Sequence, residues 1–176
     1  TARGGTQPAA TFKGSRPGDP MADIVFNFLF AKCLKKITER LDSEGLITWI
    51  QAPGGHDFLS ARRPGCSAPA DVRGPDLPDR VCLDHVTYAD DAVFFILGSA
   101  GEIVDKITRT VKIINDTLLP AGLRINYKPG KTELVIDVRG EGAREVRAQL
   151  ASGTITVNTD MAGVISVLVV KQYRHL

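Results

Sequence analysis

The sequence predicts an α+β fold in which two amphipathic helices lie against an antiparallel-rich sheet. Three patterns carry this prediction. Apolar residues recur at helical spacing over residues 21–41 and again over 103–118, and two runs of strand character flank a short acidic turn within residues 81–97. The chain has 176 residues and is 43% hydrophobic and 24% charged, which suits one domain with its own core.

The first helix is expected from Met21 to Leu41. Asp19 is a favourable N-cap residue and Pro20 suits the first helical position, while Gly45 ends the helix. A short strand is expected over 46–50, with Trp49 in the core. The apolar stripe of the helix consists of Phe26, Phe30, Cys33, Ile37 and Leu41.

Residues 52–79 contain five prolines and several glycines, which predicts a long, flexible loop within the single domain 1–176. A β-hairpin is expected next. Its strands are the apolar runs that include Val81–Thr87 and Ala92–Leu97, and its turn lies at Tyr88–Asp91.

The second helix is the most regular element of the sequence. Ser99 and Glu102 form a capping-box pattern, apolar residues repeat from Ile103 to Leu118, and Pro120 prevents continuation. The remaining pattern predicts strands starting at 123–126 and over 132–138, a short helix over 141–151, and strands over 154–157 and 164–171.

The overall charge gives no sign of a nucleic-acid-binding protein. Net charge is +2, with 11 basic against 9 acidic residues in 1–80 and 11 against 11 in 81–176, so any such binding depends on local patches. Cys33, Cys66 and Cys82 have no metal-ligand spacing and read as free thiols, which indicates a reducing intracellular compartment, nuclear or cytoplasmic. No apolar stretch is long enough for a membrane span.

The acidic turn carries the clearest chemical signal. Asp90 and Asp91 are adjacent, and two neighbouring carboxylates repel each other unless a cation lies between them. Hard oxygen ligands are those that Mg²⁺ prefers, and Mn²⁺ accepts the same ligands. The turn therefore predicts a divalent-metal site, formed by Asp90 and Asp91, at the tip of a hairpin.

Two further segments flank this hairpin. Before it, Gly14 and Gly18 bound the turn-rich loop 14–20, which leads into the first helix. After it, Gly122-Leu123-Arg124-Ile125-Asn126 precedes Lys131-Thr132. With Tyr88-Ala89-Asp90-Asp91 between them, these segments resemble reverse transcriptases of the retrotransposon or retroelement type over residues 10–50 and 81–138. Pro17 stands where the family commonly has Gln, so the contact of that Gln side chain is not expected.

This resemblance implies an RNA-directed DNA polymerase whose sheet and helices form a polymerase palm. Mg²⁺ would be held by Asp90 and Asp91, and the substrates would be an RNA template, a DNA primer and deoxynucleoside triphosphates. Tyr88 and Ala89 would lie beneath the primer terminus, and Lys131 would protonate the departing pyrophosphate. Template and nucleotide contacts would come from Gly14, Arg16 and Gly18, with Arg16 pairing with phosphate.

One element of the family pattern is missing from the sequence. The family places its first metal-binding aspartate upstream of the glycine loop, and residues 1–13 contain neither Asp nor Glu. We therefore expect the 176 residues to be part of a longer polypeptide that adds the rest of the palm, the fingers and the thumb. By themselves they are expected to be inactive.

Three alternatives remain open on the sequence. The chain can be a non-catalytic nucleic-acid-binding remnant that keeps a palm fold, or part of an RNA-directed RNA polymerase, although the Tyr-Ala lead-in favours reverse transcription. It can also be an unrelated α+β metal-binding or interaction module in which Asp90 and Asp91 form a surface turn. His85 is expected to be a partly buried strand residue, not a metal ligand.

Overall fold

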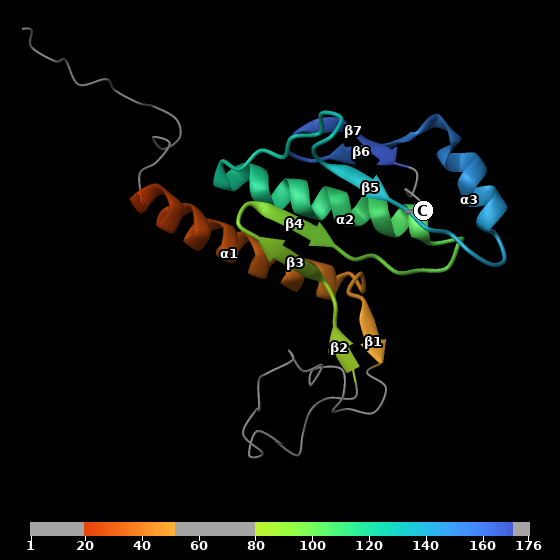
Figure 1. Ribbon diagram of the computed structural model, residues 1–176, viewed down its shortest axis with the longest axis horizontal. Coiled ribbons are helices and arrows are strands. Elements are labelled where there is room, and N and C mark those ends of the chain that lie inside the picture. The colour runs from red at the N-terminus through yellow and green to blue at the C-terminus, as the bar shows by residue number, and fades with distance from the viewer. Residues whose placement is uncertain (1–19, 52–79, 171–176) are drawn as a thin grey trace, which may run out of the picture.

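The computed structural model describes residues 20–51 and 80–170, and within these ranges the fold is mixed α+β, as predicted. Asp19 and the predicted loop at 52–79 lie outside them. Figure 1 shows the arrangement. The helices are α1 (Pro20–Ser43), α2 (Ile103–Leu118) and α3 (Ala143–Gln149). The strands are β1 (Trp49–Gln51), β2 (Arg80–Cys82), β3 (His85–Tyr88), β4 (Asp91–Phe94), β5 (Glu133–Val135), β6 (Thr154–Thr159) and β7 (Gly163–Val170).

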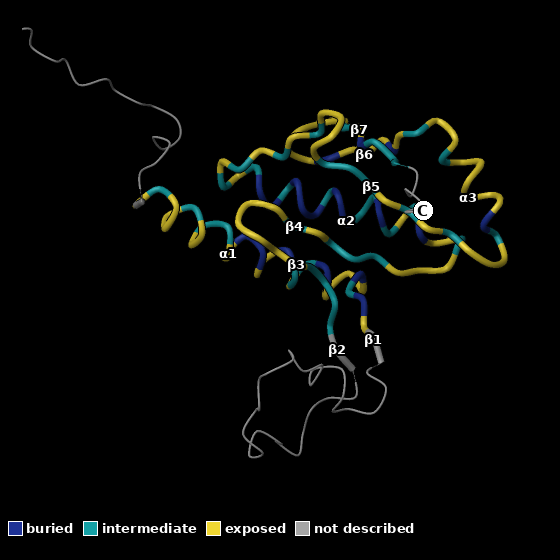
Figure 2. The backbone as a smooth tube through the Cα atoms, viewed as in Figure 1, coloured by how far each residue is buried: buried dark blue, intermediate teal, exposed yellow. Residues whose placement is uncertain are grey.

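Helix α2 is the central element because it is buried on two sides (Figure 2). Towards α1, its residues Ile113, Ile114 and Leu118 pack in one core cluster. Towards the sheet of β5, β6 and β7, its residues Ile103, Ile107 and Val111 pack in another. The partners in the first cluster are Cys33, Ile37, Leu41 and Leu46, and those in the second are Val146, Ile155, Val157 and Val167.

The strands do not form the one antiparallel-rich sheet that the sequence predicts. The described residues form three small sheets instead, ordered β1-β2, β3-β4 and β5-β7-β6. The first two are antiparallel pairs, whereas β5 runs parallel to β7. The chain passes from β5 through α3 to β6, which is antiparallel to β7, so the turn between β6 and β7 brings β7 into the same direction as β5.

A buried carboxylate fixes the turn between β6 and β7 to α2. The side chain of Asp116 is 5% exposed, and its oxygens accept hydrogen bonds from the backbone N–H groups of Asp160 (3.2 Å) and Met161 (3.1 Å). Lys112 forms an ion pair with Asp116 at 3.1 Å and also contacts Asp160. Burial alone would raise the pKa of Asp116, but these hydrogen bonds and the charge of Lys112 lower it.

Several local predictions were wrong. Trp49 is 55% exposed, because β1 and β2 form a narrow ladder that extends away from α2 (Figure 1). Residues 123–126 form no strand, because Asn126 begins a turn. Its side-chain oxygen accepts a hydrogen bond from the N–H of Lys128, and its backbone carbonyl accepts one from the N–H of Thr132. The capping box is formed only in part: the Glu102 carboxylate accepts hydrogen bonds from the backbone and side chain of Ser99, but Glu102 is itself the N-cap of α2 and makes no side-chain cap bond.

Other predictions are confirmed. The helix over 103–118 has the predicted bounds, and α1 extends the predicted 21–41 by one residue at its start and two at its end. The short helix and the last two strands lie within two residues of the predicted positions. No helix in 20–51 or 80–170 is both long and apolar enough to cross a bilayer.

We predict that packing in the β6–β7 part of the core contributes measurably to stability. Val157 is fully buried, whereas Val164 on the neighbouring strand is 68% exposed. Val157→Ala should lower the free energy of unfolding by about 2 kcal/mol, because it removes buried methyl groups and leaves a cavity. Val164→Ala should lower it by less than about 1 kcal/mol. Equilibrium urea unfolding measures both, and equal losses would contradict this packing.

Candidate metal centre

The β3–β4 hairpin places the two acids at its tip. Its pairs run from His85 opposite Phe94 to Tyr88 opposite Asp91. The loop between the strands is Ala89-Asp90, so Asp90 lies in the turn and Asp91 is the first residue of β4. The predicted hairpin is thus present, and it has a two-residue turn, the commonest short hairpin connection.

Ala89 has an unusual backbone conformation. Its φ is 54°, and it is the one non-glycine residue with positive φ among those described. A two-residue turn with positive φ at its first position and not at its second has the pattern of a type II′ turn, which normally places glycine there. A residue with a Cβ in the left-handed region costs about 1–2 kcal/mol. The tip therefore stores strain at the residue just before the acids.

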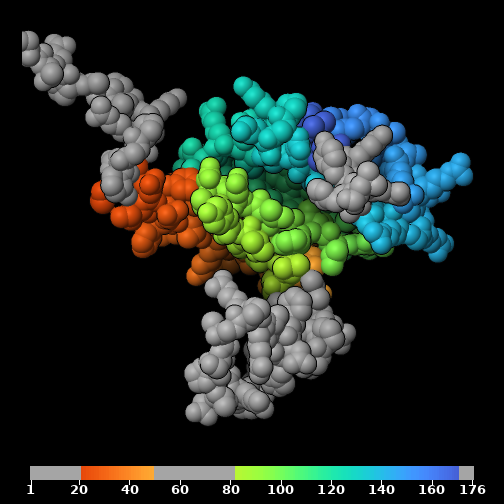
Figure 3. All heavy atoms as spheres, viewed as in Figure 1, coloured from red at the N-terminus to blue at the C-terminus, as the bar shows by residue number. Residues whose placement is uncertain are grey.

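The outer face of the hairpin is exposed. Opposed residues of an antiparallel pair share a face, so Tyr88 and Asp91 point to the same side, as do Val86 and Val93. All four are exposed, Tyr88 at 84%. Figure 3 shows the hairpin, in light green, as part of the front surface of the molecule. An exposed aromatic ring therefore stands beside an exposed carboxylate.

Asp90 and Asp91 have no neutralising partner in the described part of the chain. Neither acid forms an ion pair or a side-chain hydrogen bond there. Their oxygens are the ligand type that Mg²⁺ and Mn²⁺ bind, so the donor set fits such an ion in kind. The number of ligands is too small for a complete site, because residues 20–51 and 80–170 bring together no group of three or more His, Cys, Asp or Glu side chains that could hold a metal.

Polar contacts hold the base of the hairpin, at the end opposite the acids. Asp84 directly precedes β3, and its carboxylate accepts hydrogen bonds from the Thr38 hydroxyl on α1 (2.5 Å) and from the His85 N–H (2.8 Å). Its carbonyl accepts the N–H of Phe95 at 3.0 Å, which closes the open end of the ribbon. Asp84 thus joins the hairpin to α1.

His85 belongs to the same cluster and is partly buried, as predicted. Its Nδ1 lies 2.9 Å from the Asp84 carboxylate, yet it has no hydrogen-bond partner of good geometry among the described residues, so the contact is one of charge when the ring is protonated. Its ring centroid lies 5.6 Å from that of Phe94. Burial alone would raise the pKa of Asp84, but the hydrogen bonds from Thr38 and the His85 N–H, together with the charge of His85, lower it.

Thr48 makes the second attachment. It is 4% exposed, and its hydroxyl donates to the Phe95 carbonyl and accepts the Leu97 N–H, both at 3.3 Å. Its own carbonyl accepts the Leu83 N–H at 2.9 Å. Sequence reasoning identified none of Thr38, Thr48 and Asp84 as important. The available signal was Asp84 itself, a charge within an apolar strand run that needs a partner when it is buried.

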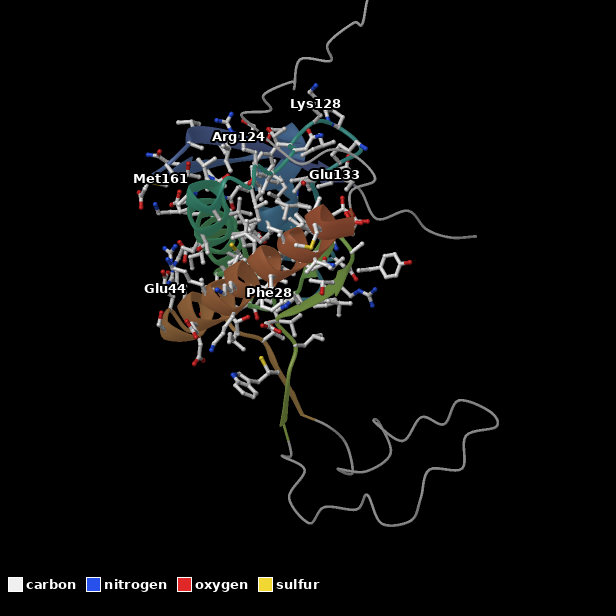
Figure 4. All side chains as sticks on the ribbon, turned by 90° about the vertical axis from the view of Figure 1, so that its left-hand side faces the viewer. Phe28, Glu44, Arg124, Lys128, Glu133 and Met161 are labelled. Atoms are coloured by element: carbon white, nitrogen blue, oxygen red, sulfur yellow. The ribbon has the colours of Figure 1, made fainter. Side chains whose placement is uncertain are left out.

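The other predicted site residues do not join the hairpin. Lys131 is exposed on the turn before β5, and no hydrogen bond or ion pair in the described ranges links it to Asp90 or Asp91. Figure 4 shows Lys128 and Glu133, which flank that turn, above the hairpin, with Lys128 at the top of the molecule. Gly14, Arg16 and Gly18 lie outside the described residues. Cys33 and Cys82 are free, and burial raises the pKa of both thiols.

Comparison with protein-family models, with curated proteins and with solved structures finds no match to this chain.

We predict that Ala89→Gly relieves strain at the tip. The substitution should leave stability unchanged or raise it by up to about 1 kcal/mol, because glycine accepts positive φ but loses more chain entropy on folding. Ala92→Gly, three residues further on in β4, is the control and should destabilise by about 0.5–1 kcal/mol. Urea unfolding of both variants measures the difference. Equal destabilisation by the two substitutions would contradict the strained turn.

Proposed function

We propose that the chain is part of a reverse-transcriptase palm that adds deoxynucleotides to a primer 3′-end on an RNA template. The observation that carries the proposal is the hairpin tip, where Asp90 and Asp91 are exposed side by side without a cationic partner among the described residues. An acidic pair at the end of a strained two-residue turn, with no cationic partner in the described ranges, is an arrangement that a bound cation would stabilise.

The backbone strain at Ala89 supports this proposal. Strained φ values in folded proteins gather at active sites and ligand-binding turns, where the surrounding structure enforces them. Here the strain occurs at the residue before the acids and four residues after His85, the partly buried first residue of β3. The small side chain of Ala89 leaves room for a nucleic-acid duplex against the tip, and the exposed Tyr88 ring offers it an apolar surface.

The open edges of the hairpin also fit the proposal. Within the ranges described, β3 and β4 pair with each other and with no third strand. A strand pair with free backbone groups at its edges can accept a further strand. In the proposed palm, such a strand supplies the third carboxylate that the described residues lack.

The role of the metal follows from the ligands. Asp90 and Asp91 would hold Mg²⁺ or Mn²⁺, which when bound supplies Lewis-acid activation of the primer hydroxyl and neutralises charge on the triphosphate. The chain's own residues present these oxygens on a hairpin whose base is held by hydrogen bonds with Thr38 and Thr48, and they leave the tip open to the substrate. Lys131 stays a proposed proton donor for pyrophosphate, and in the described residues it lies on another turn.

We predict that the hairpin acids bind Mn²⁺. Titration of the 176-residue chain, followed through the electron paramagnetic resonance signal of free Mn²⁺, should detect binding that Asp90→Asn weakens at least about tenfold, equivalent to about 1.4 kcal/mol. Asp42→Asn is the control, because Asp42 is an exposed acid on α1. Equal affinity for the wild type and Asp90→Asn would contradict a metal site at the hairpin.

We also predict that the 176 residues alone catalyse no primer extension. Two carboxylates without a third ligand among the described residues do not complete a two-metal centre. A primer-extension assay with an RNA template, a DNA primer, deoxynucleoside triphosphates and Mg²⁺ or Mn²⁺ tests this. Clear metal-dependent synthesis by the isolated chain would overturn the prediction.

A further inference from the structure

The β3–β4 hairpin lacks the support that most hairpins receive. It is a two-stranded ribbon with no neighbouring strand in the described part of the fold, and such a ribbon is marginally stable in water. Its outer face is exposed and its inner face contributes Phe94 to the α1–α2 core cluster. The orientation of the tip therefore depends on how the base is held.

Two attachments hold that base, and they differ in kind. Thr48 forms neutral hydrogen bonds on both sides: its hydroxyl bonds to Phe95 and Leu97 on the leaving side, and its carbonyl accepts the N–H of Leu83 on the entering side. Asp84 binds the strand that enters it, through charge-assisted bonds from Thr38 and from the His85 N–H. Bonds to a charged acceptor are about twice as strong as neutral ones. The side chain of Asp84 is 16% exposed, so water competes little for them.

The Thr38–Asp84 bond links the hairpin directly to α1. It joins residues 46 positions apart and is the side-chain hydrogen bond that links α1 to the β3 side of the ribbon among the bonds described. We infer that Asp84 is a positioning residue for the metal centre, acting through Thr38 and the β3 backbone to fix where Asp90 and Asp91 are presented. This inference rests on the proposed function.

The acids themselves lie too far along the ribbon for direct contact with Asp84. Four residue pairs, from His85–Phe94 to Tyr88–Asp91, separate the base from the tip. At about 3.3 Å per residue this is a separation on the order of 13 Å. Asp84 is therefore not a metal ligand, and its effect on metal binding has to pass through the orientation and rigidity of the ribbon.

The test combines amide hydrogen exchange with Mn²⁺ titration on the 176-residue chain. Asp84→Asn removes the charge, Thr38→Val removes the hydroxyl donor at nearly constant volume, and Thr38→Ser retains that donor. Asp105→Asn is the control, because Asp105 is a 69% exposed acid paired with a surface arginine on α2. If Asp84→Asn fails to fold, the Thr38→Val and Thr38→Ser pair carries the test.

We expect Asp84→Asn and Thr38→Val to accelerate exchange of the β3 and β4 amides about tenfold or more, and to weaken Mn²⁺ binding by a similar factor. Thr38→Ser and Asp105→Asn should change neither quantity by more than about twofold, and exchange at α2 residues such as Ile113 should stay slow. The inference would be overturned if the amide exchange rates of the hairpin did not change, or if those of α2 rose equally. It would also be overturned if the hairpin amides exchanged faster while the Mn²⁺ affinity stayed the same.

The two proposals fail in different ways. If the wild-type chain binds no Mn²⁺ at the hairpin, the proposed function is wrong, and the exchange data alone then decide whether Asp84 positions the ribbon. If the wild type binds Mn²⁺ and Asp84→Asn binds it equally well, the metal site stands and the positioning role of Asp84 is wrong.

Discussion

The hydrogen bond between Thr38 and Asp84 is the contact on which the candidate site depends most. It ties the entering strand of a ribbon that has no third strand in the described ranges to the longest helix described. Thr48 holds the leaving strand and, through the N–H of Leu83, the segment before the entering strand, so both strands are held at one end and free at the other. This arrangement fixes the direction of the hairpin while leaving its acidic tip exposed.

Helix α2 provides the frame for these contacts. Because its apolar residues pack against α1 on one side and against β5, β6 and β7 on the other, it unites two core clusters into one body. Asp116 attaches the β6–β7 turn to the same helix through two backbone N–H groups. The β3–β4 hairpin that bears Asp90 and Asp91 is therefore supported by the packed helices α1 and α2.

Sequence reasoning succeeded where the signal was local. The period of apolar residues from Ile103 to Leu118 specified α2, and the acidic turn between two strand runs specified the hairpin. It failed where distant contacts decide. The apolar pattern of residues 123–126 predicts a strand. It does not show that the side chain and the backbone carbonyl of Asn126 accept hydrogen bonds within a turn. The role of Asp84 could not be predicted, because its partner Thr38 lies 46 residues away and local sequence patterns do not reveal such a pair.

The most direct measurement of the central claim is paramagnetic broadening by Mn²⁺ in the amide spectrum of the 176-residue chain. If Asp90 and Asp91 form a metal centre, substoichiometric Mn²⁺ should remove the signals of residues 88–92 first and leave those of α3 and the β6–β7 turn sharp. Broadening that begins at other acids, such as Asp137 or Asp160, or that spreads evenly over all exposed carboxylates, would contradict the claim.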